Sequence, residues 1–179
     1  MNNRERIRKR TKYLTVSAML CALGVIIMSL GALLEVLDIT TSVFASMLCI
    51  YAVIEMGGFY PAGIWLSTSV LSLLLLPQKS PAVFYALFFG FYPIVKEKFD
   101  KLKRPVSWVC KLAVFHACLL LIYGAFRLFL PAQLQELGGG WFLLLLYAMF
   151  LVCFLLYDVA LNRVITYYLI RLRDRFRIK

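Results

Sequence analysis

Long apolar runs alternate with short charged or turn-forming segments along the whole chain. The clearest run, Tyr13–Leu34, has 22 residues without a charge, which is enough to cross the hydrocarbon core of a bilayer as one helix. A second stretch, Thr41–Leu76, is too long for one span, and the glycines and proline of Gly57–Pro61 near its middle predict a tight turn. The pattern therefore predicts a membrane protein built from helices.

The run from Ala82 to Val95 is short, and whether it crosses decides the topology of the whole chain. Lys and Arg near the ends of spans stay on the cytoplasmic side, and if this run did not cross, the basic segments 1–12 and 96–104 would lie on opposite sides. We therefore expect it to cross, with Lys96 extending to the interface. The six expected spans are 13–34, 41–56, 60–76, 82–96, 106–130 and 141–162.

The charges fit this arrangement. Of the 20 Lys and Arg residues, 17 lie in three clusters, 1–12, 96–104 and 163–179, whereas the expected outer loops hold one basic and three acidic residues. Orientation and attraction to anionic lipid explain the net charge of +11 better than binding to nucleic acid. With 63% hydrophobic residues, the chain is predicted to be a single all-α membrane domain over 1–179. We expect a six-helix bundle in the cell membrane with both termini in the cytoplasm.

Ionisable side chains at membrane depth are costly, so each is a functional candidate. Glu55, Lys111 and Asp158 lie toward the cytoplasmic ends of their expected helices. We interpret them as structural charges that reach the interface or pair with one another. Lys111 and Asp158 are the expected pair, because both lie at a similar depth.

One face of the fifth expected helix is polar. His116, Leu120, Tyr123 and Arg127 recur at i, i+4, i+7 and i+11, which places them on one side of a helix that we expect to point inward. The forked guanidinium group of Arg127 is suited to pair with a carboxylate or phosphate on a ligand. The side chain is also long enough to reach the outer headgroups. His116 is better explained as a hydrogen-bonded interior residue than as a metal ligand, because nothing nearby has ligand spacing.

Aromatic residues gather in the outer half of the last three expected helices. With Arg127 they form a candidate binding pocket that is apolar and has a few converging polar groups. Tyr and Trp also anchor helices at the bilayer interface, so the same residues have a purely structural interpretation. The candidate substrate-binding residues are Tyr85, Tyr123, Arg127, Trp141 and Tyr147.

The sequence gives little support to catalysis. It contains no nucleophile elbow, zinc-protease motif or phosphate-binding loop, and no cluster of carboxylates suited to phosphoryl transfer. The five cysteines all fall in apolar runs without close pairing, so we propose neither a disulfide nor a metal site. We predict no enzyme, no catalytic residue and no cofactor bound by this chain.

Small residues mark the first expected helix. Ala18 and Ala22 lie one turn apart, on a face that we expect to continue through Val25, Ser29 and Ala32 and to let another helix approach closely. With this motif, the length of the chain, six short helices and a basic N-terminal segment, the chain resembles the substrate-binding S component of energy-coupling factor (ECF) vitamin transporters. The resemblance implies that Ala18 and Ala22 face a membrane coupling subunit driven by two ATPases. It also implies a micronutrient near the outer surface among the last three helices.

Two functions of different classes follow. The first is the substrate-binding subunit of an ATP-driven ECF-type importer, with ATP hydrolysed by the partner subunits. The alternative is a membrane scaffold or assembly protein that recruits cytoplasmic partners through its basic loop, 96–104, and its basic tails. A lipid-modifying enzyme would require Asp158, His116 and Glu55 to converge, and their expected depths argue against that.

Overall fold

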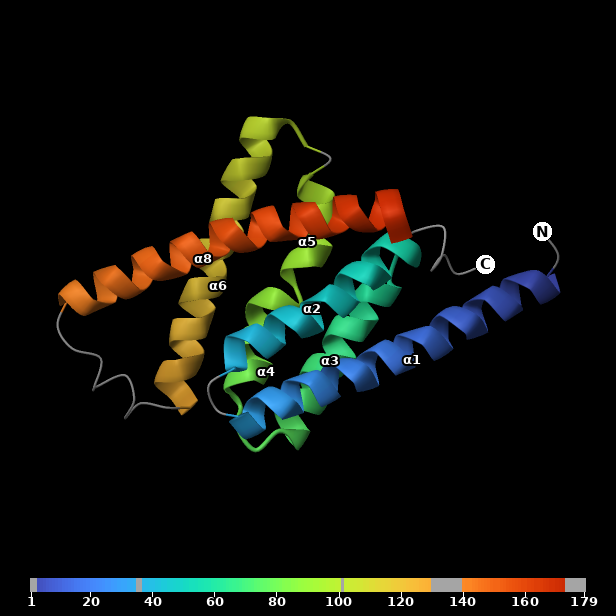
Figure 1. Ribbon diagram of the computed structural model, residues 1–179, viewed down its shortest axis with the longest axis horizontal. Helices are drawn as coiled ribbons and strands as arrows, with labels where there is room; N and C mark the ends of the chain where they lie inside the picture. The colour runs from blue at the N-terminus through green and yellow to red at the C-terminus, as the bar shows by residue number, and fades with distance from the viewer. Residues whose placement is uncertain (1–2, 35–36, 101, 130–139, 173–179) are drawn as a thin grey trace. The chain divides into compact units, whose positions relative to one another are not determined.

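The computed structural model describes residues 3–34, 37–100, 102–129 and 140–172, and every regular element in these ranges is helical (Figure 1). The all-α prediction is confirmed for this part of the chain. In order, the elements are α1 (Asn3–Leu34), α2 (Asp38–Glu55), α3 (Tyr60–Leu75), α4 (Ser80–Phe84), the π-helical turn η1 (Tyr85–Phe89), α5 (Tyr92–Phe99), α6 (Arg104–Phe129), α8 (Gly140–Tyr167) and the π-helical turn η2 (Tyr168–Leu172).

Three described helices are long and apolar enough to cross a membrane. They comprise residues Arg4–Leu34, Asp38–Glu55 and Leu144–Arg171. Two shorter apolar helices, Tyr60–Leu75 and Pro105–Leu121, accompany them. A membrane location is therefore consistent with the structure, whereas the full set of six spans and the cytoplasmic position of both termini stay predictions.

The chain divides into two compact units, residues 1–118 and 119–179. In the first unit α1 packs along α2 and α3, and α2 also contacts α4, η1 and α5 (Figure 1). The second unit contains the end of α6, together with α8 and η2. The single membrane domain expected over 1–179 stays a prediction.

The turn between α2 and α3 forms where the sequence predicts it. Gly57 and Gly58 have φ angles of 59° and 62°, a left-handed conformation that residues with a Cβ atom rarely adopt. The Gly57 amide donates to the Ala52 carbonyl at 3.1 Å and closes the end of α2. Pro61 occupies the first turn of α3, where no amide hydrogen is needed. The division of the apolar stretch into two helices is thus confirmed.

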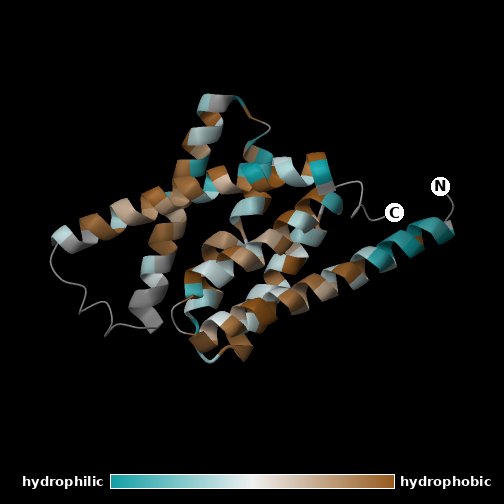
Figure 2. Ribbon diagram, in the orientation of Figure 1, coloured by the Kyte–Doolittle hydropathy of each residue, from teal (hydrophilic) through white to brown (hydrophobic). Residues whose placement is uncertain are grey.

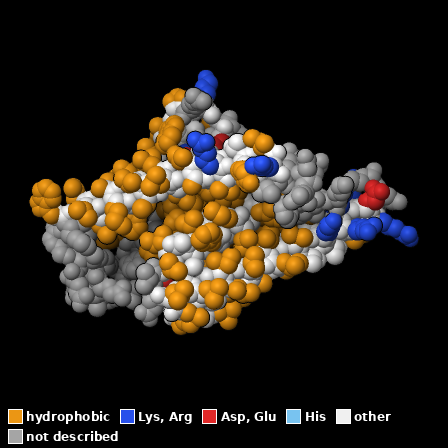
Figure 3. Space-filling view, viewed as in Figure 1, with side chains coloured by type: hydrophobic (Ala, Val, Ile, Leu, Met, Phe, Trp, Pro, Cys, Tyr) orange, Lys and Arg blue, Asp and Glu red, His pale blue; other side chains and the backbone are white. Residues whose placement is uncertain are grey.

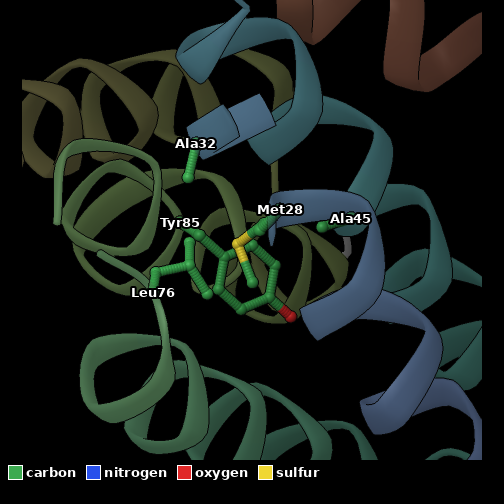
Figure 4. Close-up of a cluster of buried hydrophobic side chains, with 5 residues drawn as sticks. All are labelled: Met28, Ala32, Ala45, Leu76 and Tyr85. Atoms are coloured by element: carbon green, nitrogen blue, oxygen red, sulfur yellow. The ribbon is translucent and has the colours of Figure 1, made fainter. Parts of the chain in front are cut away.

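The core of the first unit brings together side chains from four parts of the chain (Figure 4). Met28 and Ala32 come from α1, Ala45 from α2, Leu76 from the residue after α3, and Tyr85 from η1. Each is at most 5% exposed. Ala32, which the sequence placed on a strip that lets another helix approach closely, packs against other helices inside the unit.

Two glycines of α1 set how closely the first three helices approach. A Cβ atom on Gly31 would lie 2.7 Å from Cγ2 of Thr41 in α2, and one on Gly24 would lie 3.1 Å from Cγ2 of Thr68 in α3. Both distances are shorter than ordinary carbon contacts. The absent side chains of Gly24 and Gly31 thus let α1 contact both neighbours along its buried face.

The substitution Gly31→Ala should destabilise the first unit. Its methyl group would overlap the Thr41 side chain, and overpacking of this kind costs about 1–3 kcal/mol. Thermal unfolding of the purified chain in detergent measures the effect. Gly63→Ala is the matched control, because no atom lies within 4 Å of a Cβ added to Gly63 in α3. Equal unfolding temperatures for the two variants would contradict the close approach.

Buried hydroxyl groups in this unit differ in whether they are hydrogen-bonded. Ser42 of α2 donates to the Pro81 carbonyl of α4 at 2.8 Å, a buried bond between helices. Thr68 of α3 is 1% exposed, and its Oγ1 atom has no hydrogen-bond partner among the described residues. The Ser42 hydroxyl stabilises the packing of α2 on α4. The Thr68 hydroxyl is buried without a hydrogen bond to offset its lost hydration.

Replacing these two side chains should therefore have opposite outcomes. Ser42→Ala removes the bond to Pro81 and should lower the free energy of unfolding by about 1 kcal/mol. Thr68→Val keeps the shape of the side chain, removes an unsatisfied hydroxyl and should be neutral or stabilising. Chemical denaturation of both variants in one detergent gives the comparison. A loss in Thr68→Val as large as that in Ser42→Ala would show that the Thr68 hydroxyl has a partner.

The segment expected as the fourth span is not one regular helix. It consists of α4, η1 and α5, and the helix changes its hydrogen bonding at Gly90. The Gly90 amide donates to the Tyr85 carbonyl at 2.8 Å, five residues back, and Pro93 has no amide hydrogen to donate. A Cβ atom on Gly90 would lie 2.6 Å from Cδ1 of Trp65, so only glycine fits this position without a shift.

Neighbouring helices supply hydrogen bonds to this interrupted backbone. Because Gly90 bonds to Tyr85, it does not take the Ala86 carbonyl, and Nε1 of Trp65 donates to that carbonyl at 2.9 Å. The thiol of Cys49 donates to the Gly90 carbonyl at 3.5 Å. Buried carbonyl groups need hydrogen-bond partners, and here side chains of α2 and α3 supply them.

Candidate functional site

The two alanines predicted to dock a partner lie on the outside of α1. Ala18 and Ala22 are both exposed, whereas Cys21, Gly24 and Met28 on the adjoining face are buried. The small residues of α1 therefore fall into two groups. Those in its C-terminal half pack inside the first unit. The short side chains of Ala18 and Ala22 form a shallow surface that the described part of this chain does not cover.

The candidate substrate-binding residues fall in different environments. Trp141 is 87% exposed, Tyr123 is 51% exposed and Tyr147 is 42% exposed, so all three rings are accessible. Tyr85 is 1% exposed and belongs to the core of the first unit. The side chain of Arg127 lies outside the described residues. A binding role for these five residues stays a prediction.

The buried side of α6 differs from the predicted one. In the structure His116, Leu120 and Tyr123 are exposed, and the His116 Nδ1 atom is 2.8 Å from the Leu112 carbonyl of its own helix. The buried residues of α6 are Ser107, Lys111, Phe115 and Cys118, which also recur at helical spacing. The prediction that this face points inward is therefore wrong for His116, which belongs to the first unit, and stays a prediction for Leu120 and Tyr123, which belong to the second. The buried row contains both polar and apolar residues, so polarity alone does not identify the side of α6 that packs.

An ion cluster joins the end of α5 to the start of α6. The Lys111 ammonium lies 2.7 Å from Oδ1 of Asp100, and the Lys96 ammonium lies 3.8 Å from Oδ2 of the same carboxylate. The Lys96 and Lys111 side chains are 1% and 6% exposed, whereas that of Asp100 is 42% exposed. Two buried cations thus converge on one carboxylate at the surface, and each of its oxygens faces a different lysine.

Aromatic rings surround the two ammonium groups. The Lys96 ammonium lies 5.9 Å from the centre of the Tyr92 ring, and the Lys111 ammonium lies 5.8 Å from that of Trp108. Tyr92 in turn stacks on Phe88 at 5.6 Å. These contacts let the long alkyl stems of the lysines pack inside while cation–π attraction partly replaces lost hydration.

Sequence reasoning did not find this cluster. The sequence analysis placed Lys96 and Asp100 in the basic loop 96–104, with Lys96 extending to the interface, and it expected Asp158 as the partner of Lys111. The spacing of Lys96 and Asp100 at i and i+4 in α5 was an available signal, since such residues are neighbours on a helix. Asp158 is 2% exposed and accepts from Asn162 at 3.5 Å. Its pairing with Lys111 stays a prediction.

Comparison with known proteins gives no further information on the function of this chain. No known family matches the chain. The comparison covered models of protein families, curated proteins and solved structures, and none of the three gave a match. A function for this chain therefore rests on its own residues.

The substitution Asp100→Asn should loosen the junction of α5 and α6. It removes the charge that faces two buried ammonium groups, and losing a charged hydrogen bond of this kind costs about 1–3 kcal/mol. The unfolding midpoint in detergent reports the loss. Lys98→Gln in the same helix is the control, because Lys98 is exposed and should tolerate neutralisation. A midpoint equal to that of this control would mean that the carboxylate has no structural role.

Proposed function

We propose that this protein is the substrate-binding membrane subunit of an ATP-driven importer of the ECF type. It binds a micronutrient or vitamin and docks a membrane coupling subunit that two ATPases drive. This chain performs no catalysis and holds no cofactor. Transport energy then comes from ATP hydrolysed in the partner subunits.

The exposure of Ala18 and Ala22 is the observation that carries the proposal. In lipid, helices associate through close packing and not through expulsion of water, so small residues on the outside of a helix favour contact with another helix. Gly24 and Gly31 serve that purpose inside the first unit, since their missing side chains accommodate α3 and α2. Ala18 and Ala22 have the same character but face outward.

The proposed substrate side is the set of accessible aromatic rings that follow α5. Trp141, Tyr123 and Tyr147 offer apolar surface with polar edges, which suits a small nutrient that has an aromatic or planar part. Arg127 would add a positive charge for a carboxylate or phosphate of that nutrient. Tyr85 lies in the core of the first unit, and its binding role stays a prediction.

A membrane scaffold that recruits partners through the basic loop 96–104 is the second candidate. The exposed Lys98 and Lys103 favour it, because they are available to an acidic cytoplasmic surface. Lys96 contributes less to such recruitment, because it is buried beside Asp100. Charge reversal at Lys98 and Lys103 would abolish the function of a scaffold and leave the uptake of a nutrient by an importer intact.

The double substitution Ala18→Leu with Ala22→Leu should detach the partner subunits. Two leucines would hold a neighbouring helix away from α1, and we expect retention of a coupling subunit to fall about tenfold. Affinity purification of the tagged chain from its own membranes, followed by mass spectrometry, gives the amount retained. Substrate binding by the purified chain should not change, because the substituted positions lie on the outside of α1.

The matched control is Ala113→Leu with Ala117→Leu in α6. These two alanines are also exposed and four residues apart, so the control adds the same bulk with the same spacing. Equal loss of the partners in both variants would mean a general effect on the bundle. If the unmodified chain retains no membrane subunit and no ATPases, the importer proposal is wrong, and capture of an envelope-assembly protein would support the scaffold.

A further inference from the structure

The segment from α4 to α5 keeps a helical backbone while its hydrogen bonding changes in the middle. Gly90 has φ and ψ angles of −79° and −34°, and Phe91 has angles of −78° and −40°, all typical of an α-helix. The Gly90 amide nevertheless bonds to the Tyr85 carbonyl, five residues back, and not to the Ala86 carbonyl, four residues back. The turn η1 therefore contains one residue more than an α-helical turn. Single π-helical turns inside α-helices are frequent at functional sites.

Two carbonyl groups of this segment accept hydrogen bonds from neighbouring helices. Nε1 of Trp65 in α3 donates to the Ala86 carbonyl at 2.9 Å, and the Cys49 thiol of α2 donates to the Gly90 carbonyl at 3.5 Å. The indole N–H is the stronger donor of the two, because a thiol donates only weakly. Trp65 thus occupies the acceptor that the Gly90 amide would use in an α-helix.

Packing holds the Trp65 ring in this place. The ring lies 5.5 Å from that of Phe91 and packs against the core of the first unit. A Cβ atom on Gly90 would lie 2.6 Å from Cδ1 of Trp65 and 2.8 Å from Cζ of Tyr85, so both rings close over the glycine. The π-helical bonding is therefore maintained from outside the segment, mainly by one side chain.

Return of the Gly90 amide to the Ala86 carbonyl would move all of α5 by one residue. In an α-helix one residue corresponds to about 100° of rotation and about 1.5 Å of translation. Each residue of α5 would take the place of the residue that follows it, because η1 would contain one residue fewer. Lys96, whose side chain is 1% exposed, would then take the place of the exposed Glu97.

Two further charges would change their surroundings. Lys98, which is exposed, would take the place of the half-buried Phe99. Asp100 would leave the Lys111 ammonium, which now lies 2.7 Å from its Oδ1 atom. Figure 2 shows the change from the hydrophobic η1 to the hydrophilic end of α5, and on the face seen in Figure 3 the described Lys and Arg side chains stand in small groups among hydrophobic ones. A shift of one residue is therefore enough to change the charge that this end of α5 presents.

We propose that η1 is a switch between two hydrogen-bond registers. In the first, which the structure shows, Trp65 donates to the Ala86 carbonyl and Lys96 is buried. In the second, the Gly90 amide takes that carbonyl, α5 turns by one residue and Lys96 reaches the surface. Neither register leaves the Ala86 carbonyl without a donor. The switch goes beyond the proposed function, because it needs no coupling subunit and acts within the first unit of this chain.

The substitution Trp65→Phe in the full-length chain tests the switch. It keeps an aromatic ring and removes the N–H that bonds to Ala86, so the second register should become more populated. Acetylation of lysine side chains in detergent, followed by mass spectrometry, measures the exposure of each lysine. We expect acetylation of Lys96 to rise about fivefold, the change in population that corresponds to the loss of one hydrogen bond, and that of Lys98 to fall.

Two further variants separate the switch from a loss of stability. Ser42→Ala removes the buried hydrogen bond to Pro81 in the same segment and leaves the donors of Trp65 and Cys49 in place, so Lys96 should stay protected. Cys49→Ala removes the weaker donor, the thiol on the Gly90 carbonyl, and should raise acetylation of Lys96 less than Trp65→Phe does. The Cys49→Ala variant decides the question if Trp65→Phe does not fold.

The two lysines of α5 together distinguish a change of register from local unfolding. A rise at Lys96 with a fall at Lys98 supports the switch. A rise at Lys96 without a fall at Lys98 would mean local unfolding of α5 and would overturn it, as would unchanged protection of Lys96 in both Trp65→Phe and Cys49→Ala. None of these outcomes depends on whether a coupling subunit binds, so the importer proposal stands or fails separately.

Discussion

The close approach of α1 to α2 and α3 is the constraint on which the rest of the first unit depends. At the predicted membrane location, lipid would not drive apolar helices together as water does, so their association would rely on contact area and on hydrogen bonds between helices. Gly24 and Gly31 supply the contact by removing side chains where Thr68 and Thr41 lie. The core of Met28, Ala32 and its neighbours forms only because the helix axes are near enough for such short side chains to meet.

The same closeness makes an irregular backbone possible. The segment from α4 to α5 changes its hydrogen bonding at Gly90, where the nearby Trp65 ring leaves room only for glycine, and Pro93 has no amide hydrogen to continue the regular pattern. Trp65 and Cys49 then donate to carbonyls of this segment. A helix that is short for a bilayer thus keeps its backbone bonded through its neighbours.

The sequence predicted the features that depend on local chemistry. The turn at Gly57 and Gly58 and the division of one apolar stretch into α2 and α3 follow from glycine, proline and the length of apolar runs. Which side of a helix packs inward depends on distant residues, and here sequence reasoning erred. On α6 the sequence predicted that His116 points inward, whereas it is exposed and lies outside the buried row of Lys111 and Phe115.

The ion cluster shows why a polar residue is a poor guide to the inward face. Lys111 is buried because Asp100, from the preceding turn, meets its ammonium group at 2.7 Å, and a pattern within α6 alone contains no sign of that carboxylate. The small residues of α1 show that residue size is also a poor guide to the inward face, since Gly31 and Ala22 look equivalent in sequence. Contact decides between them: Gly31 lies against Thr41, whereas Ala22 lies on the exposed side of α1. A small residue left outside a closely packed helix has no role in the packing of its own unit, and this is why Ala18 and Ala22 direct attention to a second protein.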